Sequence, residues 1–150
     1  MFRSRTVQAP PHNIPSQRLT LRERIFFSKS RRADVLAERI IGSRIANLAD
    51  AMAVKKCAEI HLKKAKKLDT GDYAPTKSLQ FLKYDQMVSE YETALRLFEK
   101  AETWLKGLGQ GEILLVVRAE IYRIREKLEQ IDGVSESVEF HESDISEWEK

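Results

Sequence analysis

The sequence predicts an all-α protein: an antiparallel bundle of three long helices with a short N-terminal helix and flexible charged tails. Three long segments repeat their apolar residues at the three- and four-residue steps of an amphipathic helix. Short stretches rich in Gly, Asp or Pro separate them, and short connections favour antiparallel neighbours. The best strand candidate, residues 114–117, continues this spacing for about five helical turns, which is too long for an average strand.

Capping signals predict where the first helices begin. Prolines before Ser16 disfavour regular structure. Thr20 and Glu23 then have the spacing of a capping box, which predicts a short helix, and Ser30 is a second candidate N-cap. One long helix is predicted over residues 34–68, with nothing at Gly42 forcing a break.

Two further helices complete the predicted bundle over residues 33–132. The segment 69–75 supplies the first turn, and the glycines from Gly107 to Gly111 supply the second. The last helix, from about Glu112 to Ile131, is predicted to stop at Gly133. The side chains expected in the core are Tyr84, Tyr91, Phe98, Trp104, Ile121, Ile124 and Leu128.

Size and composition narrow the class of protein. The chain has 150 residues, of which 33% are charged, and its mean hydropathy is −0.45, as in an ordinary water-soluble domain. We expect no membrane span and no secretory signal, and the single cysteine favours a reducing compartment. The prediction is an intracellular, most simply cytoplasmic, protein; the Arg-rich N-terminus leaves a mitochondrial or other organellar address open.

Charge is distributed unequally along the chain. Residues 1–32, a Pro- and Arg-rich arm, carry a net charge of +7, whereas residues 129–150 carry −7. Basic groups spaced along the arm are suited to neutralising nucleic-acid phosphates. The candidate nucleic-acid-binding residues are Arg18, Arg22, Arg24, Lys29, Arg31 and Arg32.

Residues 133–150 form an acidic segment that contains apolar side chains. This composition is typical of tails that become ordered on a basic partner, so Phe140, Ile145 and Trp148 are candidate partner-binding residues. The opposite charges of the two ends also suggest a hypothesis in which the tail folds back and masks residues 22–32.

A weak internal repeat links two helical segments. Ala58, Leu62, Ala65 and Leu68 stand at steps of four, three and three, and Ala94, Phe98, Ala101 and Trp104 repeat these steps 36 residues later. Residues 58–105 resemble the helical hairpins of tetratricopeptide repeats and of microtubule-interacting-and-trafficking domains. The expected leucine-glycine pair and tyrosine of a tetratricopeptide first helix are absent, since Phe81, Leu82 and Asp85 occupy those positions. The resemblance implies a peptide-binding adaptor without chemistry of its own.

Few residues suggest catalysis. Cys57 and His61, at i and i+4, share one helix face and offer two metal ligands or a thiol–imidazole pair, but a complete site needs further residues. The simpler interpretation is that Cys57 packs in the core and that His61 lies at the edge of this core. The glycines at 107–111 lack the Lys-Ser/Thr of a phosphate-binding loop. We therefore expect no catalytic residue, no cofactor and no metal.

These observations favour a non-catalytic adaptor or scaffold subunit that binds protein partners. The alternative is a protein associated with nucleic acid or ribonucleoprotein through its basic arm. The wide apolar stripe over residues 81–105 is compatible with the seam of a homo-oligomer or coiled coil as well as with a monomer core.

Overall fold

Five helices make up the computed structural model, which describes residues 14–71, 73, 78–108 and 111–148. The helices are α1 (Leu21–Phe26), α2 (Lys29–Ser43), α3 (Leu48–Leu68), α4 (Ser78–Leu108) and α5 (Gly111–Trp148). These described residues include no strand, so the prediction of an all-α protein is confirmed. None of the described helices has the length and apolar character needed to cross a membrane.

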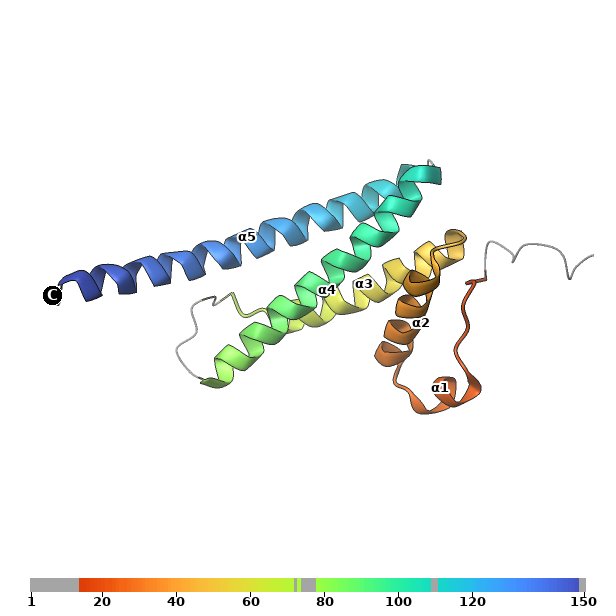
Figure 1. The fold of residues 1–150 in the computed structure, drawn as a ribbon, viewed down its shortest axis with the longest axis horizontal. Helices are drawn as coiled ribbons and strands as arrows, with labels where there is room; N and C mark the ends of the chain where they lie inside the picture. The colour runs from red at the N-terminus through yellow and green to blue at the C-terminus, as the bar shows by residue number, and fades with distance from the viewer. Residues whose placement is uncertain (1–13, 72, 74–77, 109–110, 149–150) are drawn as a thin grey trace, which may run out of the picture.

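The long helices pack mainly on their neighbours in the chain. Helix α4 packs against both α3 and α5, and α2 packs against α3. In Figure 1, α3 and α5 run in one direction and α4 runs in the other. Helix α1 lies beside α2 at one end of the molecule, and the C-terminal end of α5 lies at the opposite end.

The predicted capping box at the start of α1 is confirmed. The Thr20 side chain accepts a hydrogen bond from the Glu23 amide, and the Glu23 carboxylate accepts one from the Thr20 amide. The same carboxylate forms an ion pair with Arg39 of α2, and this interaction together with the hydrogen bonds to Thr20 lowers the pKa of Glu23 to about 2. The pair holds the short helix against α2.

The N-cap of α2 is Ser28, not Ser30 as predicted. The Ser28 side chain accepts a hydrogen bond from the Arg31 amide at 3.2 Å, whereas Ser30 lies inside the helix and contacts Lys64 of α3. Serine is a preferred N-cap residue, so either position could begin the helix. The contact of Ser30 with Lys64 of α3 distinguishes the two serines. The earlier start places Asp34 beyond the first turn, on the side that faces α3.

The prediction of a single helix over residues 34–68 is wrong, because the helix is interrupted: α2 ends at Ser43 and α3 begins at Leu48. Asn47 caps α3 by accepting a hydrogen bond from the Asp50 amide at 2.8 Å. Asp50 is fully buried and accepts hydrogen bonds from the Ser16 amide, the Ser16 hydroxyl and the Ala46 amide. Asn47 also donates to the Ile14 carbonyl, so residues 14–16 of the predicted arm are held against the start of α3.

Arg44, in this break, has a backbone conformation that favours glycine. Its φ is 99°, where a Cβ atom is strained. We expect Arg44→Gly to raise the free energy of unfolding by about 1 kcal/mol. Gln130→Gly on the exposed surface of α5 is the control and should lower stability by about 1 kcal/mol. Urea unfolding of both variants measures the two signs, and an equal loss of stability in both would contradict the strain at Arg44.

One hydrophobic core joins α2, α3, α4 and α5. Of the predicted core residues, Tyr91, Phe98, Ile121 and Ile124 are buried. Tyr84, Trp104 and Leu128 are partly buried and pack against the same core. Alanines of α3 and α4, among them Ala58 and Ala94, are fully buried, and their small side chains let the two helices approach closely.

Helix α5 does not stop at Gly133 as predicted. It continues to Trp148, so the backbone of residues 133–148 extends this helix instead of forming a separate tail. A glycine in a helix costs about 1 kcal/mol relative to alanine, but it ends the helix only if it leaves the helical conformation. The end of α5 lies far from α1 in Figure 1, so this arrangement does not mask residues 22–32.

Candidate functional site

The six predicted basic residues occupy one stretch of the described structure. Arg18 precedes α1, Arg22 and Arg24 belong to α1, and Lys29, Arg31 and Arg32 belong to the first four residues of α2. All except the half-buried Arg32 are exposed. The Arg31 guanidinium lies over the Phe27 ring, with 3.9 Å between its central carbon and the ring centroid.

The positive charges at the start of α2 are unfavourable for that helix. A helix N-terminus carries partial positive charge, so cations there cost about 0.3–1 kcal/mol each, and the first turn of α2 contains no acidic residue. Arg31 is offset by its contact with the Phe27 ring, but the helix dipole does not explain Lys29 and Arg32. Residues that oppose the local preference of their element are expected at functional positions.

A groove of about 330 Å³ begins at Lys29 and Arg32 and runs between α2 and α3. Its surface combines apolar side chains with three positive charges. The lining residues are Leu19, Lys29, Arg32, Ala33, Leu36, Ala53, Lys56 and Ile60. Lys29 and Arg32 come from α2 and Lys56 comes from α3, so positive charge borders the apolar surface from both helices.

Arg32 has a nitrogen that lacks a hydrogen-bond partner. Among the described side chains, the Arg32 Nε atom is the buried polar atom left without one. A buried donor without an acceptor costs about 1–3 kcal/mol, more when it is charged. Arg32 also lines the groove, so an anionic group bound there would satisfy this donor if the guanidinium turned toward it.

Sequence reasoning named Arg32 and Lys29 as candidate site residues and Lys56 as one of several lysines that extend the basic surface, but it did not place Lys56 and the apolar lining beside them. Lys29 and Arg32 are separated in sequence from Lys56 by the interruption at residues 44–47, where the chain turns so that α3 packs against α2. The missed signal was Asn47 three residues before Asp50, the spacing of a helix N-cap and an acidic N3 residue.

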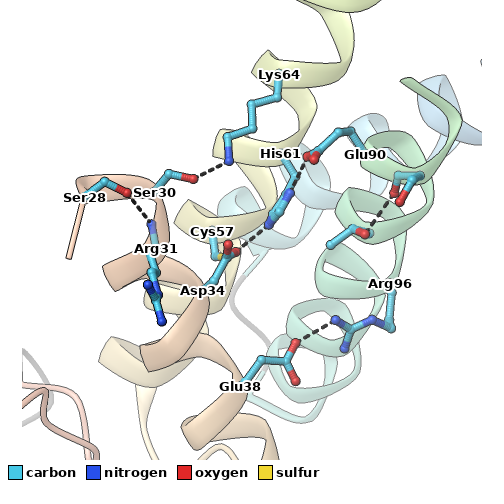
Figure 2. Close-up of polar contacts among 12 residues, drawn as sticks. Ser28, Ser30, Arg31, Asp34, Glu38, Cys57, His61, Lys64, Glu90 and Arg96 are labelled. Atoms are coloured by element: carbon cyan, nitrogen blue, oxygen red, sulfur yellow. Dashed lines mark hydrogen bonds and ion pairs between the residues drawn. The ribbon is translucent and has the colours of Figure 1, made fainter. Parts of the chain in front are cut away.

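A second cluster of polar side chains joins α2, α3 and α4. Asp34 Oδ1 lies 2.5 Å from His61 Nε2 and 3.2 Å from Cys57 Sγ, which donates its thiol hydrogen. His61 Nδ1 lies 2.5 Å from Glu90 Oε2. Figure 2 shows the imidazole ring between the two carboxylates, with Cys57 beside Asp34. The fold thus brings together the predicted Cys57–His61 pair and two acids from other helices.

The thiol in this cluster is not an activated nucleophile. Burial, the hydrogen bond to Asp34 and the negative charges of Asp34 and Glu38 all raise the pKa of Cys57. The side chain is also buried. A reactive cysteine needs an exposed thiolate, so this arrangement does not support thiolate chemistry. It retains the donor atoms that a metal ion requires.

A third polar cluster, around Asp69, fastens the end of α3. The Asp69 carboxylate accepts hydrogen bonds from the Tyr91 hydroxyl of α4 at 2.7 Å, from the Tyr73 hydroxyl and from the Gly71 amide. Lys127 of α5 lies 3.5 Å from it. Burial alone would raise the pKa of Asp69, but these hydrogen bonds and the charge of Lys127 outweigh burial and lower it.

The Asp69 cluster predicts a dependence of stability on pH. Because its folded-state pKa lies below the ordinary value of 3.8, its stabilisation is present above that value and is lost as the pH falls through the folded-state pKa. At pH 7 we expect Asp69→Asn to lower the free energy of unfolding by about 1–3 kcal/mol. The difference from wild type should shrink below pH 4 in urea unfolding; a difference independent of pH would contradict this role.

Several apolar side chains remain exposed on α1 and α5. Leu21, Ile25 and Phe26 are exposed on α1, and Leu115 and Tyr122 are exposed on α5. Single exposed apolar residues are common, but clusters mark contact surfaces. The predicted partner-binding residues Phe140, Ile145 and Trp148 fall in the last part of α5, and their side chains lie outside the described structure.

Comparison with known proteins identifies no matching family model, no similar characterised protein and no similar solved structure. The resemblance of residues 58–105 to tetratricopeptide and microtubule-interacting-and-trafficking hairpins therefore rests on the spacing of their alanines, leucines and aromatic residues alone. The groove and the polar clusters are the features of the structure that bear on function.

Proposed function

We propose that this protein is a non-catalytic interaction module, an adaptor or scaffold subunit, that binds an acidic protein segment with apolar side chains in the groove between α2 and α3. The observation that carries the proposal is the unpaired Arg32 Nε atom beside a groove with positive charges and an apolar lining. A carboxylate of the partner would accept a hydrogen bond from Arg32. The apolar side chains of the partner segment would cover Leu36 and Ile60.

The apolar lining favours a protein segment over nucleic acid. Phosphate contacts need cations, which the exposed Arg18, Arg22 and Arg24 supply equally well, but they do not need an apolar surface. An amphipathic segment buries apolar area as well as pairing charges, and apolar burial provides most of the stability of such complexes. The exposed Phe26 and Ile25 of α1 extend the apolar surface available on the same stretch of chain.

Charge complementarity also specifies the occupant. A charged rim steers an oppositely charged partner toward the groove and disfavours basic partners. The C-terminal segment of this chain, residues 132–150, has the required acidic and apolar composition. A synthetic peptide of this sequence is therefore a suitable probe, and its binding would also support self-association of the chain.

Fluorescence anisotropy of the labelled 132–150 peptide tests the proposal. We expect Arg32→Glu to weaken binding at least tenfold, because it replaces an attractive charge by a repulsive one at the groove. Lys83→Glu, the matched control, makes the same charge change at an exposed position of α4 and should change the affinity less than threefold. Equal effects of both variants would show attraction to net charge only and would contradict a specific groove.

A second titration distinguishes the nucleic-acid alternative. Single-stranded DNA of similar charge should bind with an affinity that falls steeply with salt, and Ile60→Ala should leave that affinity unchanged. The peptide should lose less affinity with salt and should be weakened by Ile60→Ala. If DNA binds more tightly than the peptide at 150 mM salt, the basic arm is a nucleic-acid-binding element and the proposed function is wrong.

A further inference from the structure

The cluster of Asp34, Cys57 and His61 has the composition of a metal-binding site. One donor atom from each residue, Asp34 Oδ1, Cys57 Sγ and His61 Nε2, lies within 4.8 Å of the other two. Two of these residues are one turn apart on α3, and the third comes from α2. A thiolate, an imidazole and a carboxylate together suit Zn²⁺, which takes sulfur, nitrogen and oxygen ligands.

Glu90 occupies the position of an outer-shell carboxylate. A histidine that binds a metal through one ring nitrogen usually donates the hydrogen on the other nitrogen to a carboxylate or carbonyl. His61 Nδ1 lies 2.5 Å from Glu90 Oε2, so this contact fixes the ring with Nε2 toward Asp34 and Cys57. Figure 2 shows Glu90 approaching the ring from α4, on the side opposite Asp34.

Charge balance favours an exchange of protons for a divalent cation. If Asp34 and Glu90 are both ionised, each carboxylate can only accept, so a ring that bonds to both donates from each nitrogen, and Cys57 donates its thiol hydrogen to Asp34. A divalent cation would replace the hydrogen on Nε2 and the hydrogen on Sγ, and both protons would pass to solvent. Two positive charges leave and two arrive, so the net charge of this partly buried cluster is unchanged.

The space required is small. Zinc bonds of about 2.0–2.3 Å in tetrahedral geometry separate ligand atoms by roughly 3.3–3.7 Å. The Asp34–Cys57 separation is 3.2 Å and the Asp34–His61 separation is 2.5 Å. The Asp34 side chain is 41% exposed, so it can shift outward by about 1 Å without disturbing the core. A water molecule would supply the fourth ligand from this exposed side.

We propose that Asp34, Cys57 and His61 bind one Zn²⁺ ion, with Glu90 orienting the histidine. The site links α2 to α3 and, through Glu90, to α4, so the bound cation stabilises the packing of the helices that form the groove. The proposal goes beyond the interaction function and does not depend on it.

Titration of the metal-free protein with Co²⁺ tests the site. Because Cys57 is the single cysteine of the chain, a thiolate-to-cobalt absorption band identifies this residue without ambiguity. We expect the band to saturate at one Co²⁺ per chain and to disappear when Zn²⁺ is added. Thermal unfolding should shift to higher temperature with Zn²⁺. A folded wild-type protein that gives no such band at equimolar Co²⁺ overturns the proposal.

Variants assign the individual ligands. Cys57→Ser should abolish the band, His61→Gln should abolish stoichiometric binding, and Glu90→Gln should weaken Zn²⁺ binding about 10–100-fold, the usual effect of losing an outer-shell partner. The double variant His12→Gln, His141→Gln is the control and should bind like wild type. Circular dichroism verifies folding of each variant. Loss of Zn²⁺ binding in the control, or its retention in folded His61→Gln, overturns the assignment.

Discussion

Replacing Asp50 by alanine is expected to lower the free energy of unfolding by about 3–5 kcal/mol, because three hydrogen bonds to a buried carboxylate are lost. The Ser16 amide and hydroxyl donate to Asp50, each at 2.6 Å, and the Ala46 amide donates at 2.8 Å. The carboxylate is fully buried, so water does not replace it without rearrangement. The variant would remove the shared acceptor of these three donors and leave a cavity at the buried position.

Urea unfolding of Asp50→Ala measures this loss. Glu59→Ala is a matched control, because Glu59 is an exposed acid on the same helix whose polar contact, within the part of the chain that the structure describes, is an i,i+4 ion pair with Lys55. Its removal should cost less than about 1 kcal/mol. Similar losses in both variants would contradict the anchoring of residues 14–16. Because Leu19 lines the groove, Asp50→Ala should also weaken binding of the 132–150 peptide.

Replacing Phe98 by alanine is expected to lower the free energy of unfolding by about 3–5 kcal/mol, since it removes a ring from the packed core and leaves a cavity. Phe98 is the largest of the fully buried side chains. It belongs to α4, the helix that packs against both α3 and α5. Its loss should therefore weaken both contacts together.

Leu82→Ala is the control for Phe98→Ala. Leu82 lies on the same helix but is exposed, so its truncation should change stability by less than about 0.5 kcal/mol. Chemical unfolding followed by circular dichroism compares the two variants. A loss below 1 kcal/mol for Phe98→Ala would show that α4 does not hold the core as the structure indicates.

Local signals predicted much of the fold. The capping box at Thr20 depends on residues three apart, and the spacing of Tyr91, Phe98, Ile121 and Ile124 depends on helical periodicity, so both could be identified from sequence. The break after Ser43 was missed because the apolar spacing continues through it. Its cause is the buried Asp50, whose partners at Ser16 are 34 residues away.

The candidate sites depended still more on tertiary structure. Sequence spacing paired Cys57 with His61, since residues four apart share a helix face. Asp34 and Glu90 join them only because α2 and α4 pack beside α3, and such contacts over 27 and 29 residues have no local pattern. Similarly, the basic residues of the groove were evident from charge, but its apolar lining required the fold.

Nuclear magnetic resonance gives the most direct test of the groove. Titration of the ¹⁵N-labelled protein with the unlabelled 132–150 peptide reports binding at each backbone amide. If the groove is the binding site, the largest saturable shifts occur at Ala33, Leu36, Ala53, Lys56 and Ile60, and Arg32→Glu reduces them. Shifts centred on Leu115 and Tyr122 of α5, or no saturable shifts at all, would contradict the groove as the interaction surface.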